Sequence, residues 1–134
     1  MRLKLQQRHI TSIEKEARRM YPIEACGMLF GKTTPSEAVV QKIVTSPNIL
    51  QSPKRFEINP EAVVKTITEC EKEGLAFIGL FHSHPAPPDP SPVDLKFMKL
   101  WGDAIWLILS STQYTLAAFQ IKDDELNQVH ITIK

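Results

Sequence analysis

Two histidines separated by one residue, His82 and His84, carry the strongest chemical signal in the sequence. They come at the end of a short apolar run that is typical of a buried β-strand, and side chains two residues apart on a strand point to the same side. The two imidazoles can therefore share one metal ion. A catalytic zinc site has three protein ligands and leaves a fourth position for water, so this pair requires a carboxylate as its third ligand.

Two aspartates are candidates for that carboxylate. Asp94 lies ten positions after His84, near the start of a predicted helix, and a tight loop can bring it back to the histidines. Asp89 is nearer in the sequence but lies inside a proline-rich loop, so we prefer Asp94 and keep Asp89 as the alternative ligand. Half of the chain's 10 prolines fall in the segment from Pro85 to Pro92. Such a stiff segment loses less entropy on ordering than a glycine-rich one, which suits a fixed metal site.

The hydrophobic pattern predicts the elements that must hold these residues. Short alternating or continuous apolar runs indicate strands, and apolar residues at helical spacing indicate helices. Pro22 ends the first helix, whereas Asn59 and Pro60 form a good start for the second. The predicted strands cover residues 2–5, 25–31, 39–45 and 76–81, and two or three more follow at 104–109, 115–121 and 129–133. The predicted helices cover residues 9–20, 60–73 and 91–101.

The order of these elements predicts one α/β or α+β domain with a mixed sheet flanked by helices. The run over residues 76–81 is apolar throughout, as expected for a central strand covered on both faces, and His82 is predicted to lie where this strand ends. Residues 46–60 form an irregular excursion with a brief extended piece at 56–58. No repeat, linker or second domain is evident over residues 1–134.

Composition and charge exclude several classes of function. The chain has 134 residues, of which 43% are hydrophobic, enough for one core. Its net charge of +1 is too small for a nucleic-acid-binding surface. The apolar runs are too short to cross a bilayer, and charges interrupt the N-terminus where a signal peptide needs apolar residues, so we expect no membrane association. Two cysteines, Cys26 and Cys70, form neither a CxxC pair nor a disulfide framework, which favours the cytoplasm. Nothing in the sequence predicts an oligomeric state.

Three segments of the chain resemble one known family. The sequence His82-Ser83-His84-Pro85, five residues, Ser91, two residues, Asp94 resembles the His-x-His-Pro…Ser-x-x-Asp signature of JAMM (MPN-plus) metalloproteases. The stretch from Tyr21 to Gly31 is similar to that family's Pro-x-Glu-x-Cys-Gly-x-Leu-x-Gly segment, and the stretch from Asn48 to Pro60 is similar to the block that follows it. The resemblance covers nearly the whole chain, which looks like the short stand-alone bacterial and archaeal members.

This resemblance implies a single JAMM domain of cytidine-deaminase-like architecture with one zinc ion held by His82, His84 and Asp94. It also implies that Glu24 is the general acid/base, which takes a proton from the zinc-activated water and returns it to the leaving amine. Ser91 would donate a hydrogen bond to the oxyanion. The implied substrate is the amide bond after the C-terminal tail of a ubiquitin-like or sulfur-carrier protein.

One spacing departs from the family pattern. Members usually have seven residues between the second histidine and the serine, and this chain has six. We expect either a tighter loop or a displacement of Ser91 or Asp94 that lowers metal affinity or turnover.

Several of these residues also have purely structural explanations. Ser91 is a good N-cap, with Asp94 in the first turn facing the positive end of the helix dipole. Glu24, taken alone, reads as a solvated glutamate, and His9 and His130 are expected to be exposed. Four further residues are assigned to packing: Cys26, Cys70, Trp101 and Trp106.

Two other functions compete with the isopeptidase hypothesis. A non-catalytic MPN scaffold would pair with another subunit, but such scaffolds typically lack the ligand set that this chain keeps. A metal-dependent hydrolase of a small molecule would turn over simple esters or amides and ignore proteins. A cupin, which can also contain His-x-His, requires an all-β pattern that the predicted helices contradict.

Overall fold

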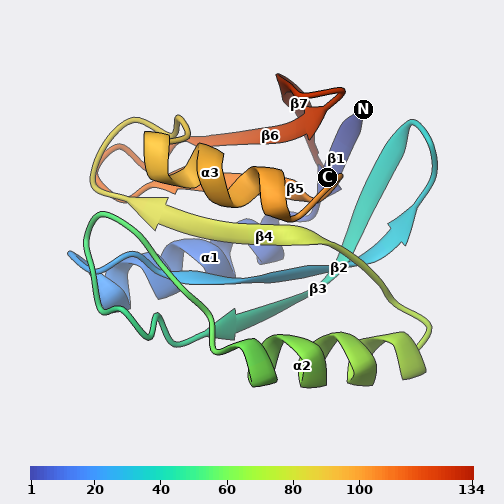
Figure 1. Cartoon of the computed structure of the whole chain (residues 1–134), viewed down its shortest axis with the longest axis horizontal. Coiled ribbons are helices and arrows are strands. Elements are labelled where there is room, and N and C mark those ends of the chain that lie inside the picture. Colours follow the sequence, from blue (N-terminus) through green and yellow to red (C-terminus); the bar gives the residue numbers. More distant parts are fainter.

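The computed structural model describes all 134 residues of the chain (Figure 1). Seven strands and three helices alternate in a mixed order, which confirms the prediction of an α+β domain. In chain order they are β1 (Arg2–Leu5), α1 (Gln7–Met20), β2 (Cys26–Thr33), β3 (Glu37–Ser46), α2 (Pro60–Lys72), β4 (Ala76–His84), α3 (Pro92–Leu100), β5 (Ile105–Ser110), β6 (Leu116–Lys122) and β7 (Glu125–Ile133).

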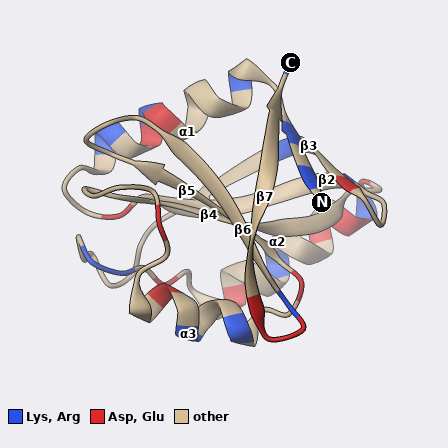
Figure 2. Cartoon of the chain, turned by 90° about the horizontal axis from the view of Figure 1, so that it is seen from above, with Lys and Arg blue, Asp and Glu red and all other residues tan.

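The strands close into a barrel in the order β1-β3-β2-β4-β5-β6-β7. Most neighbours are antiparallel, but β4 pairs with β5 in parallel, and β1 pairs in parallel with both β3 and β7. The predicted mixed sheet is therefore present, and β4 lies inside it with a partner on each side. A view from above shows α1 on one side of the strands and α2 and α3 on the other (Figure 2).

The hydrophobic core has two parts, one that includes α1 and one that includes α2 and α3. One hydrophobic cluster draws residues from all seven strands and from α1, so it fills the barrel interior. The other cluster covers the outer face of β2, β4, β5 and β6, where Cys70 of α2 and Met98 of α3 pack. Along β4, Phe81 points into the barrel and Leu80 points to the outer face, as strand alternation requires. His82 shares the side of Leu80 and so faces α3.

Some element boundaries differ from the prediction. β4 continues to His84, three residues beyond the apolar run 76–81, so both histidines lie in the last part of the strand. β3 starts at Glu37 and β7 at Glu125, earlier than predicted, because their first residues pair with neighbouring strands although they are polar. No strand forms at 56–58, although the carbonyl of Glu57 accepts a hydrogen bond from the N–H of Ile49.

The second helix begins as the sequence predicts. The side chain of Asn59 accepts hydrogen bonds from the N–H groups of Glu61 and Ala62, and Pro60 is the first helical residue. The expectation that His9 is exposed was wrong: it is 3% exposed, and its Nδ1 accepts a hydrogen bond from the N–H of Gln6 at the start of α1. None of the three helices combines the length and apolar character needed to cross a membrane.

Candidate metal centre

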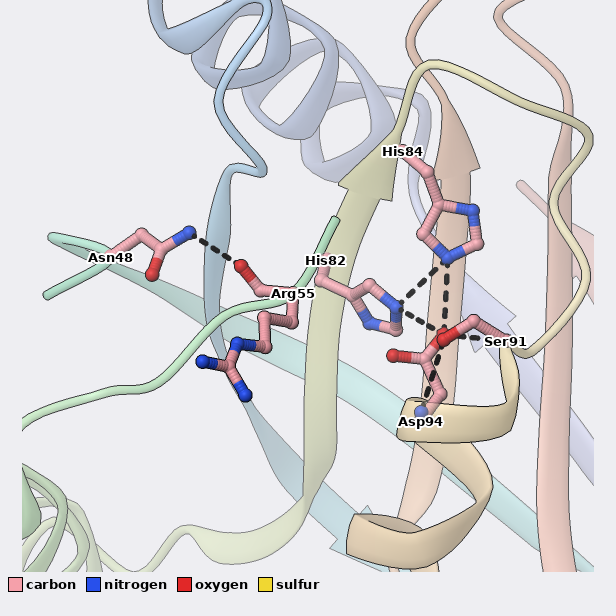
Figure 3. Close-up of polar contacts among 6 residues, drawn as sticks. All are labelled: Asn48, Arg55, His82, His84, Ser91 and Asp94. Atoms are coloured by element: carbon pink, nitrogen blue, oxygen red, sulfur yellow. Dashed lines mark hydrogen bonds and ion pairs between the residues drawn. The ribbon is translucent and has the colours of Figure 1, made fainter. Parts of the chain in front are cut away.

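Three side chains from two elements meet at the C-terminal end of β4 (Figure 3). The Nε2 atoms of His82 and His84 are 3.2 Å apart, and each lies 3.1 Å from Oδ2 of Asp94. The two histidines come from β4 and the aspartate from the first turn of α3. All three residues are buried. Asp89, the alternative ligand, lies exposed on the loop between these elements and outside the cluster.

The three facing atoms have the geometry of one face of a tetrahedral metal site. Zinc bonds to nitrogen and oxygen are about 2.0–2.1 Å long, so neighbouring ligand atoms around a tetrahedral ion are about 3.3 Å apart. The observed separations of 3.1 to 3.2 Å come close to that value. Two imidazoles and one carboxylate also form a donor set that suits a divalent ion such as zinc. The residues present therefore fit a metal ion with one coordination position left open.

The protonation states favoured by the structure are those that a metal requires. Burial opposes the charged form of Asp94, but hydrogen bonds to His82 and His84 outweigh it and hold the pKa of this carboxyl well below its usual range. Burial lowers the pKa of His82, although the nearby Asp94 carboxylate opposes this shift. An ionised carboxylate and a neutral imidazole are the forms that bind metal ions.

The start of α3 holds Asp94 in place through a reciprocal cap with Ser91. The backbone N–H of Ser91 donates to Oδ2 of Asp94 at 2.9 Å, and the backbone N–H of Asp94 donates to Oγ of Ser91 at 3.1 Å. The structural explanation for Ser91 is therefore correct. The shortened loop does not displace Asp94, because its carboxylate still lies 3.1 Å from both imidazoles.

Packing orients the ring of His82. Phe56 stacks on it with ring centres 4.7 Å apart, and Trp106 meets it edge-on at 5.9 Å. Its Nδ1 is buried without a hydrogen-bond partner, so these two aromatic rings, together with the contact of its Nε2 with Asp94, set the orientation of the imidazole. Sequence reasoning assigned Trp106 to the core and gave Phe56 no role. The contact between Phe56 and His82 depends on the path of loop 47–59, and no local pattern predicts that path.

Glu24 lies just before β2 and is 1% exposed, which differs from the solvated glutamate expected for this residue alone. Burial, and next the charge of Asp94, raise its pKa to about 8. Its Oε1 is buried without a hydrogen-bond partner. A carboxyl group with these properties can take up and release a proton near neutral pH.

Two polar side chains hold the backbone around Glu24. The side-chain amide of Asn48 donates to the carbonyl oxygens of Glu24 and Arg55, both at 3.1 Å, and its Oδ1 accepts from two further N–H groups. Ser83, between the two histidines, accepts a hydrogen bond from the N–H of Ala25 at 2.9 Å. Sequence reasoning gave neither residue a role. A small polar residue that is buried typically has such a role, but the burial of these two residues is known only from the structure.

An apolar groove opens beside the three clustered residues. It has a volume of about 350 Å³ and lies between α2 and α3. Asp94 and the aromatic side chains of Phe56, Phe97 and Trp101 form part of its lining. Phe97 is 41% exposed there although it is a large apolar residue. An exposed apolar surface of this kind is typical of a binding site.

Comparison with known proteins places this chain among related sequences. Residues 6–122 match the family described as prokaryotic homologs of the JAB domain. A desampylase from Pyrococcus furiosus is 40% identical over 113 residues, which cover 84% of this chain and 77% of that protein. A desampylase from Haloferax volcanii is 26% identical over 84% of this chain and 80% of its own length. A probable TtuB-protein conjugate cleaving protease from Thermus thermophilus is 34% identical over 58% of this chain and 51% of that protein.

A solved structure has the same fold. The solution structure of a protein from Desulfitobacterium hafniense superposes with a TM-score of 0.88 and 29% sequence identity. The match covers 98% of this chain and 92% of the other. The barrel and its helices are therefore shared over almost the full length.

Proposed function

The chain belongs to the family of prokaryotic JAB-domain homologs, and from that membership we propose that it is a zinc-dependent isopeptidase. Its substrate is the amide bond after the C-terminal tail of a ubiquitin-like or sulfur-carrier protein. The names of its relatives support this proposal, since two are desampylases and a third is a protease of TtuB-protein conjugates. The observation that carries it is the buried cluster of two imidazoles and a carboxylate beside a protonatable Glu24.

In this proposal His82, His84 and Asp94 hold one zinc ion per chain. The 3.1 to 3.2 Å triangle of their ligand atoms supports it. When bound, the zinc would act as a Lewis acid and lower the pKa of a bound water molecule towards about 7. We further propose that the mixed sheet with its helices has a cytidine-deaminase-like architecture.

Glu24 acts as the general acid/base in the reaction. Its carboxylate takes a proton from the attacking water, and the resulting carboxylic acid gives that proton to the leaving amine as the carbon–nitrogen bond breaks. In the metal-free protein burial raises the pKa of Glu24 to about 8, so this carboxyl can carry or release a proton near neutral pH. Its burial keeps the carboxyl group away from bulk solvent.

Ser91 stabilises the charge that develops on the carbonyl oxygen. Its Oγ already accepts a hydrogen bond from the N–H of Asp94, which leaves its hydroxyl hydrogen available to donate. Ser91 can therefore cap α3 and donate to the oxyanion at the same time. A single donor of this type contributes about 3 kcal/mol to transition-state stability.

The apolar groove between α2 and α3 receives the tail of the ubiquitin-like protein. It borders Asp94, and one wall comes from Arg55, Phe56, Glu57 and Ile58. An extended tail along this wall would bring its terminal carbonyl group to the ligand cluster. The same aromatic residue, Phe56, would contact both the tail and the ring of His82.

Cleavage of a defined conjugate tests the proposal. A ubiquitin-like protein joined through its C-terminal glycine to a lysine side chain is incubated with zinc-loaded wild type, with Glu24→Gln, and with a chelated sample. Glu125→Gln is the matched control, because Glu125 is an exposed residue of β7. We expect cleavage by wild type and Glu125→Gln only. Cleavage that survives in Glu24→Gln would overturn the role of Glu24, and a protein that binds no zinc would overturn the catalytic proposal.

A further inference from the structure

A second hollow lies next to α1, on the opposite side of the strands from α2 and α3 (Figure 2). It has a volume of about 370 Å³ and opens widely to solvent. Five residues line it: Arg18, Tyr21, Ser111, Thr112 and Tyr114. Two tyrosines, two hydroxyl side chains and one guanidinium give it a polar and aromatic character, unlike the apolar groove between α2 and α3.

This hollow is connected directly to the residues of the proposed active site. The backbone N–H of Ser111 donates a 2.8 Å hydrogen bond to the carbonyl oxygen of His84. On its other side Tyr21 lies at the end of α1, three residues before Glu24. One residue of its lining, Ser111, is therefore bonded to the backbone of the last histidine of the cluster, and another, Tyr21, begins the segment that leads to the general acid/base.

The side chain of Arg18 is free to bind an anion in this hollow. Its guanidinium lies over the ring of Tyr114, 4.6 Å from the ring centre, but makes no ion pair or hydrogen bond within the chain. Its neighbour Arg19 differs, because it pairs with Glu16 at 2.8 Å. No acidic residue lines the hollow. A guanidinium fixed by stacking and free of an internal partner can form paired hydrogen bonds to a carboxylate.

The position of Tyr114 depends on an unusual backbone conformation. Its φ angle is +56°, in the left-handed region that residues other than glycine rarely adopt. The turn between β5 and β6 imposes this conformation, since the N–H of Tyr114 donates to the carbonyl of Ser110 at 2.9 Å. The turn therefore holds the ring of Tyr114 against the guanidinium of Arg18.

The two hollows lie on opposite sides of the strands, one at α1 and one between α2 and α3 (Figure 2), and the chemistry of the reaction assigns one part of the substrate to each. Glu24 gives its proton to the leaving amine, so the lysine of the target protein must lie next to Glu24. The ubiquitin-like tail then lies on the side of Asp94, in the apolar groove. We propose that the hollow next to α1 binds the target-protein segment that carries the modified lysine, and that Arg18 selects targets with an acidic side chain beside that lysine. This inference rests on the proposed isopeptidase function.

Matched conjugates test this selectivity. The same ubiquitin-like protein is joined to the lysine of a peptide with flanking glutamates, to a peptide with glutamines in their place, and to a small aromatic amine. For Arg18→Ala we expect kcat/KM to fall about tenfold on the acidic peptide, mainly through KM, and to stay unchanged on the other two substrates. Arg19→Ala is the control and should resemble wild type on all three. An equal loss on every substrate, or none on the acidic peptide, would overturn the inference.

Binding of the free peptides separates this inference from the proposed function. Titration of the uncoupled acidic peptide into the wild-type protein should shift the backbone NMR signals of Ser111, Thr112 and Arg18. Arg18→Ala should weaken this binding about tenfold, whereas Arg19→Ala should not. If no conjugate is cleaved but the peptide binds in this Arg18-dependent way, the catalytic proposal fails and the binding site stands. Equal binding to wild type and Arg18→Ala rejects the site whatever the activity.

Discussion

Ser83 links β4 to the segment that carries Glu24 by two hydrogen bonds to Ala25. Its Oγ accepts from the N–H of Ala25 at 2.9 Å, and its own N–H donates to the carbonyl of Ala25 at 3.0 Å. Because Ser83 stands between His82 and His84, the same residue that spaces the two imidazoles also fixes the register of Glu24 against them. The middle residue of the His-x-His pair is therefore a structural part of the site.

Removal of this hydroxyl should weaken both stability and turnover. In Ser83→Ala the buried N–H of Ala25 loses its acceptor, which should cost about 1–3 kcal/mol in the free energy of unfolding. We expect zinc affinity to change little, since all three ligands remain, and kcat to fall because Glu24 is less well placed. Denaturant unfolding, zinc titration and conjugate cleavage measure the three effects. Ser12→Ala, at an exposed position of α1, is the control; an equal loss of zinc affinity and kcat would contradict a role through Glu24.

Replacement of the carboxylate should separate the two candidate ligands. Asp94→Asn removes the charge that faces both imidazoles, so we expect zinc affinity to fall more than about a hundredfold. Asp89→Asn is the matched control, and it should bind zinc as wild type does because Asp89 is exposed and outside the cluster. Isothermal titration against a competing chelator gives both affinities. The opposite ranking would show that the loop rearranges to use Asp89.

The stability of the metal-free protein should depend on pH through Glu24. Its pKa is raised from 4.5 to about 8 on folding, so the folded state binds the proton more tightly than the unfolded chain. The contribution of Glu24 to stability is therefore fully present below about pH 4.5 and is lost as the pH rises through about 8. Glu24→Gln should remove this loss, and the difference between the two proteins should reach a few kcal/mol by pH 9.

Unfolding by urea between pH 5 and 9 measures that difference. Subtraction of the Glu24→Gln curve removes the contribution of His82, whose lowered pKa acts in the opposite direction over part of this range. The lowered pKa of Asp94 acts only at acidic pH, because its stabilisation is lost as the pH falls below the usual range of a carboxyl. Parallel curves for wild type and Glu24→Gln would mean that Glu24 is not buried as a neutral acid.

The sequence predicted most elements and the approach of His82, His84 and Asp94 through short-range patterns, together with the family resemblance that favoured Asp94 over Asp89. His82 and His84 share a side through strand alternation, and Ser91 and Asp94 form a cap within one helical turn. The contacts of Asn48, Ser83 and Phe56 could not be predicted in this way. These contacts join segments that are distant in the chain. Their partners are backbone groups or aromatic rings, which no sequence pattern marks as contact partners. The closure of the sheet by β1 and β7 likewise depends on long-range pairing.

The variant Gly79→Ala tests the close approach of β4 and β5, on which the position of the two histidines depends. A Cβ atom at this position would lie 1.8 Å from the carbonyl oxygen of Ile105. Gly79→Ala should therefore force the strands apart and cost more than about 3 kcal/mol, or prevent folding. Gly74→Ala is the control, because it meets no atom within 4 Å and suffers only from its φ of +81°. Thermal unfolding of both variants decides the matter; similar melting temperatures would show that β5 can shift at little cost.

The apolar groove should contribute to substrate binding through Phe97. This side chain is 41% exposed on α3 and lines the groove that borders Asp94. In Phe97→Asp a charge replaces the apolar surface offered to the ubiquitin-like tail, so we expect KM for a conjugate to rise about tenfold or more with little change in kcat. Leu126→Asp is the matched control, since Leu126 is 45% exposed on β7 and outside the groove. Zinc affinity should be unchanged in both variants. If Leu126→Asp raises KM as much as Phe97→Asp does, the tail does not bind between α2 and α3 but on another part of the surface.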